Sequence, residues 1–158
     1  MLILGIILLG TGVLFLAANF LTYLSVAKLW PLFMLIPVAV LLAVGMQYKD
    51  KLPAVILPVI ILTFYCGYFL WLNFTSWSYA ATTWPNFLIG PGLGFLVLYL
   101  ITHKSEFLIP TFIMFILSAS FYGALLGNTL IVAILMMSLG VVLVLSGLIK
   151  GKQKDDKG

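Results

Sequence analysis

The sequence predicts an all-α integral membrane protein with six transmembrane helices. Of its 158 residues, 64% are hydrophobic and 8% are charged, whereas soluble domains contain roughly 45–50% apolar and about 25% charged residues. The apolar residues form six runs of about the length, ~20 residues, that crosses a bilayer as a helix. The few lysine, aspartate and glutamate side chains cannot cover a water-facing surface of this size, so most of the exterior must face hydrocarbon.

Turn-forming, aromatic and charged residues separate the six runs. In chain order the predicted spans are Leu2–Leu21, Trp30–Met46, Pro53–Leu72, Trp84–Thr102, Phe107–Tyr122 and Asn128–Ile149. The second and fifth spans reach about 25 Å at about 1.5 Å per residue, which predicts little tilt or a locally thin membrane. The first run lacks a basic segment before it and is long for a signal peptide, so we expect it to be retained. Residues 1–149 then form one transmembrane domain, and residues 150–158 form a flexible tail that carries both lysines and aspartates.

The lysines predict the orientation of the helices. Seven of the eight basic residues fall in the loops after the second and fourth spans or in the tail, and only Lys28 falls on the opposite side. Short loops that are rich in lysine stay in the cytoplasm. The sequence therefore predicts a multi-pass membrane protein with both termini in the cytoplasm.

Aromatic residues collect at the external edge that this orientation defines. All four tryptophans fall there, namely Trp30, Trp71, Trp77 and Trp84. Tryptophan prefers the headgroup layer because its apolar ring enters the acyl region while its N–H reaches water. An anchoring belt is the simpler interpretation. A docking surface for a lipid headgroup or a partner helix is the alternative, because aromatic belts usually occupy both interfaces of a membrane.

The most specific pattern is an internal repeat with a period of 54 residues. Asn19-Phe20 and Asn73-Phe74 are each followed, eleven residues after the asparagine, by a Trp-Pro pair. The shared pattern N-F-x9-W-P-x-F-x3-P contains six identities in register. It predicts helical hairpins at residues 2–48 and 53–102 that run the same way through the membrane, related by an axis along the membrane normal. Residues 107–149 have the length and direction of a third, degenerate copy.

Proline at two equivalent positions predicts kinks in the second and fourth helices. Pro37 and Pro91 lie inside their predicted spans, and each lacks the N–H that would bond to the carbonyl four residues earlier. The carbonyls of Phe33 and Phe87 are therefore left without their helical partners. Interrupted helices at corresponding places in two repeats are typical of the midplane binding site of a transporter, whereas shaping of the helices for packing is the simpler interpretation.

Small and amide residues predict close contacts between helices. Gly90 and Gly94 form a G-x-x-x-G spacing in the fourth span, which lets helix backbones approach closely. Asn19 and Asn73 lie near the external ends of their helices. We expect these asparagines to cap or cross-bond helices rather than to bind a ligand.

One part of the chain resembles a known family. Residues 5–19, G-I-I-L-L-G-T-G-V-L-F-L-A-A-N, and residues 29–36, L-W-P-L-F-M-L-I, are similar to the two-helix transmembrane region of LiaI/LiaF-type bacterial envelope proteins. Those proteins have a glycine-rich first helix with a late asparagine and a second helix that opens with Trp-Pro. The resemblance covers residues 3–47 and, more loosely, residues 57–101. It implies a non-enzymatic role in envelope-stress sensing, signalling or scaffolding.

The predicted spans lack the residues that most enzymes need. The single histidine, His103, lies at a membrane boundary, and no carboxylate lies at membrane depth, so we expect no catalysis, no metal site and no cofactor. The lysines lie at helix ends rather than on one face, which excludes nucleic acid as a partner. We therefore expect an inner-membrane protein with a structural, scaffolding or envelope-stress regulatory role. Its expected partners are membrane lipids and either another membrane protein or a second copy of itself.

A passive transporter, a channel or a lipid-binding membrane protein is the alternative function. It would use the kinked second and fourth helices, whose free carbonyls would coordinate a bound molecule. Transporters that are coupled to ions or protons normally bury ionisable residues, and the predicted spans contain none at membrane depth. The alternative is therefore limited to passive movement or to the binding of a lipid or another apolar molecule.

Overall fold

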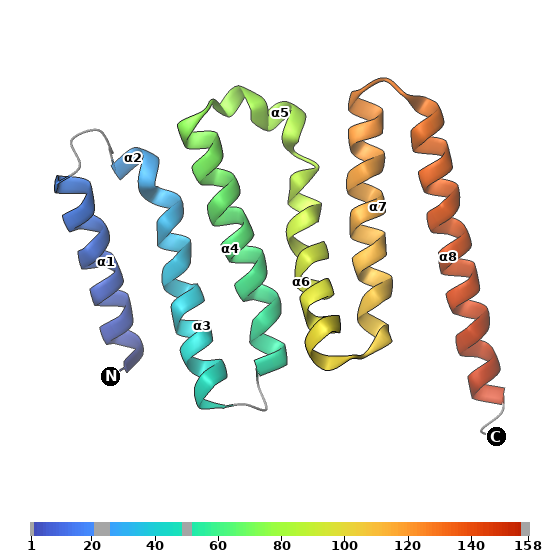
Figure 1. Ribbon diagram of the computed structural model, residues 1–158, viewed down its shortest axis with the longest axis horizontal. Coiled ribbons are helices and arrows are strands. Elements are labelled where there is room, and N and C mark those ends of the chain that lie inside the picture. The colour runs from blue at the N-terminus through green and yellow to red at the C-terminus, as the bar shows by residue number, and fades with distance from the viewer. Residues whose placement is uncertain (1, 21–25, 49–51, 156–158) are drawn as a thin grey trace.

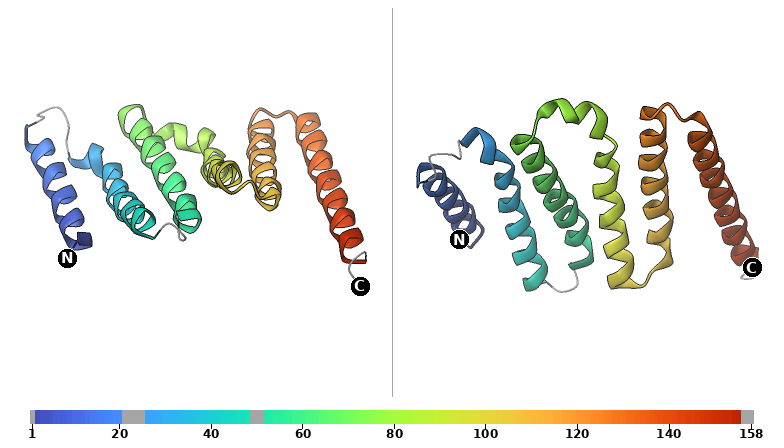
Figure 2. Two further views of the ribbon diagram at one scale, coloured as in Figure 1. Left: turned by 60° about the horizontal axis from the view of Figure 1, so that its bottom comes forward. Right: turned by 45° about the horizontal axis from the view of Figure 1, so that its top comes forward.

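The chain folds into a single curved row of helices (Figure 1, Figure 2). The computed structural model describes residues 2–20, 26–48 and 52–155, and no strand occurs in these residues. The long helices follow one another along the row in chain order: α1 (Leu2–Phe20), α3 (Leu35–Gln47), α4 (Leu52–Phe74), α6 (Asn86–Thr102), α7 (Leu108–Leu125) and α8 (Thr129–Asp155). The predicted all-α class is therefore confirmed for the described part of the chain.

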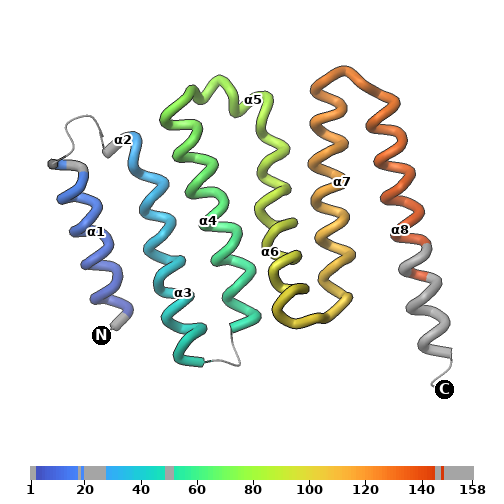
Figure 3. The backbone as a smooth tube through the Cα atoms, in the orientation of Figure 1, coloured from blue at the N-terminus to red at the C-terminus, as the bar shows by residue number. Residues whose placement is uncertain are grey.

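Short helices connect several of the long ones. α2 (Val26–Leu29) and η1 (Trp30–Met34) lead into α3, η3 (Trp77–Tyr79) and α5 (Ala80–Thr83) join α4 to α6, and η4 (Ser105–Phe107) leads into α7. The backbone trace in Figure 3 shows α5 at one edge of the row, between the end of α4 and the start of α6. The segments Trp77–Thr83 and Asn86–Thr102 meet at a bend of 66°. Pro85 stands at this bend, where its missing N–H stops the helical bonding of α5 from continuing into α6.

Several helices are long and apolar enough to cross a membrane. Within the described ranges they are Trp30–Gln47, Leu52–Phe74 and Ser105–Leu125, and the bent segment from η3 to α6 makes a fourth if it is counted as one span. The described apolar stretches of α1 and α8, Ile3–Ala17 and Thr129–Val144, are shorter. These lengths fit a membrane protein, but they establish fewer spans than the six that the sequence predicts.

Large apolar side chains are exposed along the two end helices. Leu9 in α1 is 72% exposed, and Leu130 in α8 is 73% exposed. The main long-helix neighbour of α1 is α3, and that of α8 is α7, so the row leaves their other faces uncovered. In water such surfaces would favour aggregation, whereas hydrocarbon solvates them without penalty. Fully buried apolar residues lie instead on the middle helices, for example Cys66 and Leu72 in α4 and Leu98 in α6.

Tight turns reverse the chain between neighbouring helices. α6 ends at His103, which adopts a left-handed conformation with φ 53° and donates its N–H to the Tyr99 carbonyl at 2.7 Å. Gly127 takes a similar conformation, with φ 69°, between α7 and α8, and glycine adopts it without steric strain because it has no Cβ. Figure 1 shows the start of α1 and the end of α8 at the same edge of the row as the end of α3, the start of α4 and the connection from α6 to α7.

Two predicted boundaries differ from the structure. The second span begins as the 3-10 helix η1, and the α-helix α3 starts only at Leu35, because tighter turns are common at helix starts. α8 continues to Asp155, although the sequence predicts a flexible tail from residue 150. A helix can extend past an apolar span because its backbone hydrogen bonds do not depend on apolar side chains. Lys49, Lys51 and residues 156–158, which enter the predicted orientation and tail, lie outside the described residues.

Candidate functional site

Hydroxyl groups of α4 hold the start of α6. The Tyr65 hydroxyl donates a hydrogen bond to the Phe87 carbonyl at 2.7 Å. This carbonyl lacks its usual helical partner because Pro91, four residues later, has no N–H. The Tyr68 hydroxyl lies 2.8 Å from the hydroxyl of Thr83, just before α6. The carbonyl that the sequence predicts to be free is therefore paired within the protein.

α7 adds two hydrogen bonds to the same turn. The buried Ser118 hydroxyl donates to the Pro85 carbonyl at 2.9 Å, and the Tyr122 hydroxyl donates to Asn86 Oδ1 at 2.7 Å. Pro85 is fully buried, and its carbonyl also accepts the backbone N–H of Leu88 at 3.0 Å, so the Ser118 hydroxyl is its second donor. Interhelical bonds of this kind contribute about 0.6 kcal/mol each on average in membrane proteins. Side chains of two neighbouring helices therefore fix residues 83–87, the start of α6.

Four tryptophans mark one edge of the row, the tryptophan edge: Trp30, Trp71, Trp77 and Trp84. Three of them join one aromatic cluster, in which the Phe69 ring lies 5.3 Å from Trp30 and 6.0 Å from Trp77. Trp71 joins it by stacking on Tyr68 at 6.2 Å. Trp84 packs separately on a phenylalanine ring of α7 at 4.6 Å. All four remain 37–51% exposed, so each one both packs inward and presents an outer surface.

Asn73 forms a second hydrogen-bonded centre at the tryptophan edge. Its amide nitrogen donates to the Lys28 carbonyl at 2.9 Å, and its Oδ1 accepts from the Trp77 indole N–H at 2.8 Å. Asn73 therefore cross-bonds α2 and η3 to the end of α4. Asn19, at the equivalent position of the predicted repeat, is exposed, and its side chain has no hydrogen-bond partner among the described residues.

Three alternate glycines let α6 pack closely on both sides. A Cβ atom built on Gly90 would lie 2.9 Å from the ring of Tyr65 in α4. A Cβ atom on Gly94 would lie 2.7 Å from Leu57, also in α4. A Cβ atom on Gly92 would lie 3.2 Å from a phenylalanine ring of α7. Gly90 and Gly94 thus provide a close approach to α4, and Gly92 adds an approach to α7 that the predicted G-x-x-x-G spacing does not include.

The two prolines of the predicted repeat occupy different positions in their helices. Pro37 is the third residue of α3, which begins directly after η1. Pro91 lies in the interior of α6. Pro58, which is not part of the predicted repeat, lies in the interior of α4. Of the two repeat prolines, only Pro91 therefore removes a hydrogen bond from beyond the first turn of an α-helix.

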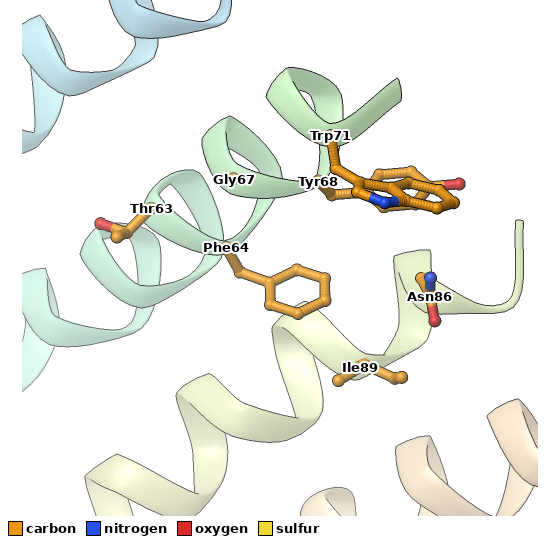
Figure 4. Close-up of a pocket in the computed structure, with 7 residues that line it drawn as sticks. All are labelled: Thr63, Phe64, Gly67, Tyr68, Trp71, Asn86 and Ile89. Carbon is orange, nitrogen blue, oxygen red and sulfur yellow. The ribbon is translucent and has the colours of Figure 1, made fainter. Parts of the chain in front are cut away.

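An open groove of about 500 Å³, the α4–α6 groove, lies between α4 and α6. Figure 4 shows its lining residues, which are Thr63, Phe64, Gly67, Tyr68, Trp71, Asn86 and Ile89. A smaller groove of about 240 Å³, the α1–α3 groove, lies between α1 and α3. It is lined by Ile6, Gly10, Leu14, Leu32, Leu35, Ile36 and Ala39. The α4–α6 groove combines aromatic, hydroxyl and amide groups, whereas the α1–α3 groove has only apolar side chains and glycine.

The hydroxyl residues that hold α6 do not belong to any predicted motif. Tyr65 and Tyr68 are three residues apart, and Ser118 and Tyr122 are four residues apart. Both spacings place side chains on one face of a helix. Polar residues that recur at this spacing inside an apolar span are the sequence signal that predicts an interhelical contact, although the pattern does not reveal which group each hydroxyl meets.

No family model, curated protein or solved structure matches this chain. The resemblance of residues 3–47 to LiaI/LiaF-type hairpins therefore stays a prediction. The function is accordingly inferred from the helix contacts and from the two grooves.

Proposed function

We propose that the chain is a non-enzymatic scaffold of the bacterial inner membrane, with six spans and both termini in the cytoplasm. The hydrogen bond from Tyr65 to the Phe87 carbonyl is the observation that carries this proposal. A passive carrier or channel built on broken helices uses free carbonyls to coordinate its cargo. Here a side chain of the same protein occupies the carbonyl that Pro91 leaves free, so the interruption of α6 serves packing.

The other bonds at the start of α6 support a fixed arrangement of helices. Tyr68 of α4 and Ser118 and Tyr122 of α7 contact the same turn from both sides. A gating movement of α6 would have to break these bonds together, in a setting where unpaired polar groups are costly. A rigid row of helices instead suits a protein that holds partners at set positions in a membrane.

A pair of aromatic contacts supports a duplicated hairpin. The rings of Phe15 and Phe33 pack with their centroids 6.5 Å apart. Phe69 and Phe87, each 54 residues later, pack with their centroids 5.8 Å apart. The first pair joins α1 to η1, which leads into α3, and the second pair joins α4 to α6. The conserved spacing of these contacts is expected if two copies of one hairpin keep the same helix packing.

At a second pair of equivalent contacts, the large and the small residue have changed places between the two helices. In the first hairpin, Ile36 fills the space over Gly10, with its Cγ1 atom 3.1 Å from the position of a Cβ. In the second hairpin, Phe64 fills the space over Gly90, with its Cδ1 atom at 3.1 Å. Residues 10 and 64, like residues 36 and 90, are 54 positions apart. Such an exchange keeps the interface filled while the sequence diverges.

The lengths of the end helices support six spans. α1 contains 19 residues, and α8 contains 27 residues, of which 150–155 belong to the predicted polar tail. At about 1.5 Å per residue, α1 is about 28 Å long and the part of α8 before the tail is about 31 Å long, against about 30 Å for a hydrocarbon core. The start of α1 and the end of α8 lie at one edge of the row (Figure 1), and we place this edge in the cytoplasm.

The resemblance to LiaI/LiaF-type hairpins supports a role in the envelope-stress response. The partner in this role is another membrane protein or a second copy of the chain. The outward surfaces of the tryptophan edge and the exposed faces of α1 and α8 offer contact area for it, and membrane lipids cover the remaining apolar surface.

Single cysteines test the six-span arrangement. Ser76 precedes η3 at the tryptophan edge, and Ser105 begins η4 at the opposite edge. In a Cys66→Ser background, we expect Ser76→Cys to react with a membrane-impermeant maleimide in intact cells, and Ser105→Cys to react only after lysis. Reaction of both positions from the same side would contradict the proposed topology.

Solute release from vesicles separates a scaffold from a passive carrier. Wild type and a variant with both Pro37→Ala and Pro91→Ala would be reconstituted in vesicles of phosphatidylethanolamine and phosphatidylglycerol. We expect neither form to release a small neutral solute faster than protein-free vesicles, whereas the double variant unfolds at a different temperature. Release by wild type that the double variant loses would overturn the scaffold proposal.

A further inference from the structure

The α4–α6 groove has a polar rim and an apolar interior. Trp71 and Asn86 stand on opposite sides of the groove, and Figure 4 shows the indole nitrogen and the amide nitrogen on the sides that face each other. Phe64 and Ile89 line the groove further along the two helices. Gly67 keeps this part open, because a Cβ atom built on it would meet no atom within 4 Å. The groove therefore runs from the tryptophan edge into an apolar space.

Two side-chain N–H groups at the rim are not used by the hydrogen bonds within the described part of the protein. Tyr122 donates to Asn86 Oδ1, which orients the amide so that its nitrogen projects away from α7. The Tyr68 hydroxyl is paired with the hydroxyl of Thr83. In the part of the chain that the structure describes, neither the Asn86 amide nitrogen nor the Trp71 indole nitrogen has a protein acceptor. A molecule that fits this rim must therefore bring acceptor oxygens.

The surroundings of the groove favour a lipid as the source of these oxygens. All the residues that line the groove are uncharged, so an ion pair is not needed to hold the acceptor. The ester carbonyls of phospholipids lie near the interface, the depth at which tryptophan rings prefer to reside. The volume of about 500 Å³ also falls in the range of pockets that hold small molecules, about 300–1,000 Å³.

We propose that the α4–α6 groove binds one phospholipid, whose ester carbonyl accepts hydrogen bonds from Trp71 and Asn86 and whose acyl chain enters the apolar part of the groove. The inference rests on the membrane placement in the proposed function. The α1–α3 groove provides the contrast, since Leu32 stands there at the position equivalent to Asn86. That groove has no side-chain N–H donor in its lining and holds lipid only by apolar contact.

Filling the groove tests the proposal. Gly67→Leu points a side chain into open space, so the variant should fold. Gly12→Leu is the matched control, because a Cβ atom on Gly12 also meets no atom within 4 Å but Gly12 lines neither groove. Delipidated protein in detergent would be titrated with dioleoylphosphatidylethanolamine, and native mass spectrometry would count the bound lipids. We expect wild type and Gly12→Leu to retain one lipid at the same concentration, and Gly67→Leu to need at least about tenfold more.

Removing one donor tests the rim. Trp71→Phe keeps a ring that stacks on Tyr68 and removes only the indole N–H, and Trp84→Phe is the control outside the groove. Loss of one hydrogen bond should weaken lipid retention about threefold to tenfold for Trp71→Phe alone.

Three outcomes would overturn the lipid site. Equal lipid retention by wild type and Gly67→Leu would show that the lipid does not bind in the groove. Equal retention by Trp71→Phe and Trp84→Phe would show that the Trp71 indole N–H does not bind the lipid. A change in oligomeric mass for Gly67→Leu with unchanged lipid retention would assign the groove to a second copy of the chain. Release of wild type from membranes by alkaline carbonate would instead refute the membrane placement of the proposed function.

Discussion

The two hairpins formed by α1 with α3 and by α4 with α6 pack alike but are held together differently. In the second hairpin, the Tyr65 hydroxyl reaches across to the Phe87 carbonyl of the facing helix. Thr11, 54 residues before Tyr65, instead donates to the Ile7 carbonyl of its own helix at 2.6 Å. Tyr65 therefore gives the second hairpin a hydrogen bond between its helices. At the equivalent Thr11 the first hairpin has no such bond, and its helices are held there by apolar packing.

The grooves of the two hairpins show the same contrast. Four residues of the α1–α3 groove lie 54 positions before four residues of the α4–α6 groove. The pairs are Gly10 and Phe64, Leu14 and Tyr68, Leu32 and Asn86, and Leu35 and Ile89. Tyrosine and asparagine in place of leucine turn an apolar groove into one with a polar rim. In the proposed duplication, both copies keep the packing and only the second carries the polar groups.

The position of each hairpin in the row explains this difference. α6 lies between α4 and α7 and receives hydrogen bonds from both. α1 has only one long helix, α3, as its main neighbour, and a Cβ atom on Gly12 would meet no atom within 4 Å. In hydrocarbon, polar side chains are favourable only where a partner is within reach. A helix with two neighbours therefore tolerates more of them than a helix at the end of the row.

Of the substitutions that test this comparison, overpacking at Gly90 should change the free energy of unfolding most. Gly90→Ile places a branched side chain where the ring of Tyr65 would lie 2.9 Å from its Cβ, and we expect it to lower the free energy of unfolding by about 1–3 kcal/mol or more. Adding Phe64→Gly removes the second ring at this position, whose Cδ1 atom would lie 3.1 Å from the same Cβ, and leaves that of Tyr65. It places glycine opposite isoleucine, as at Gly10 and Ile36 in the first hairpin. Thermal unfolding in detergent should therefore show a higher unfolding temperature for the double variant than for Gly90→Ile alone. If Phe64→Gly lowers the temperature further, the two hairpins do not share one packing geometry.

The positions of the helices were predictable from the sequence, whereas their arrangement in a row was not. The predicted spans Pro53–Leu72 and Trp84–Thr102 end within two residues of the bounds of α4 and α6, because a long apolar run in a membrane has few structures other than a helix. These helices are apolar on all sides, so composition does not distinguish Leu98, which is 4% exposed, from Leu100, which is 57% exposed. For that reason the sequence did not show which faces of neighbouring helices pack together.

The candidate site was predictable only in part. Pro91 predicts that the Phe87 carbonyl loses its helical partner, because this follows from covalent chemistry alone. The donor that replaces the partner is Tyr65, and its identity depends on the distance and rotation between α4 and α6. The predicted close approach at Gly90 follows from its missing Cβ, but the neighbour that uses the space is again a matter of tertiary packing.

A smaller effect is expected from the bond that joins α7 to α6. Ser118→Ala removes one of the two donors to the buried Pro85 carbonyl, the other being the Leu88 N–H, and should lower the free energy of unfolding by about 1 kcal/mol. Ser120, which is also buried in α7, donates to the Ile116 carbonyl of its own helix at 2.8 Å. Ser120→Ala should have less than half this effect, because a hydroxyl that bonds back to its own helix adds little stability. Chemical denaturation in micelles measures the unfolding free energy of both variants. A larger loss of unfolding free energy for Ser120→Ala than for Ser118→Ala would show that the cross-helix bond is not the stabilising one.

The smallest expected effect lies in α1. Gly12→Ala should raise the free energy of unfolding by about 0.5 kcal/mol, because alanine favours the helix more than glycine does and its Cβ meets no atom within 4 Å. Gly90→Ala in α6 should act in the opposite direction, since its Cβ would lie 2.9 Å from the ring of Tyr65 and 3.1 Å from the ring of Phe64. The unfolding temperatures of both variants in the same detergent provide the measurement. A shift of the same sign in both would contradict the difference between an end helix and a middle helix.

A double-mutant cycle of Tyr65→Phe and Pro91→Ala tests most directly the claim that the interruption of α6 serves packing. In wild type, Tyr65→Phe leaves the Phe87 carbonyl without its donor and should lower the free energy of unfolding by about 1 kcal/mol. Pro91→Ala returns a backbone N–H to that carbonyl, so Tyr65→Phe should have little effect in this background. We predict a coupling energy of about 0.5–1 kcal/mol from the unfolding free energies of the four forms. A coupling energy near zero, with the two losses simply additive, would contradict the claim.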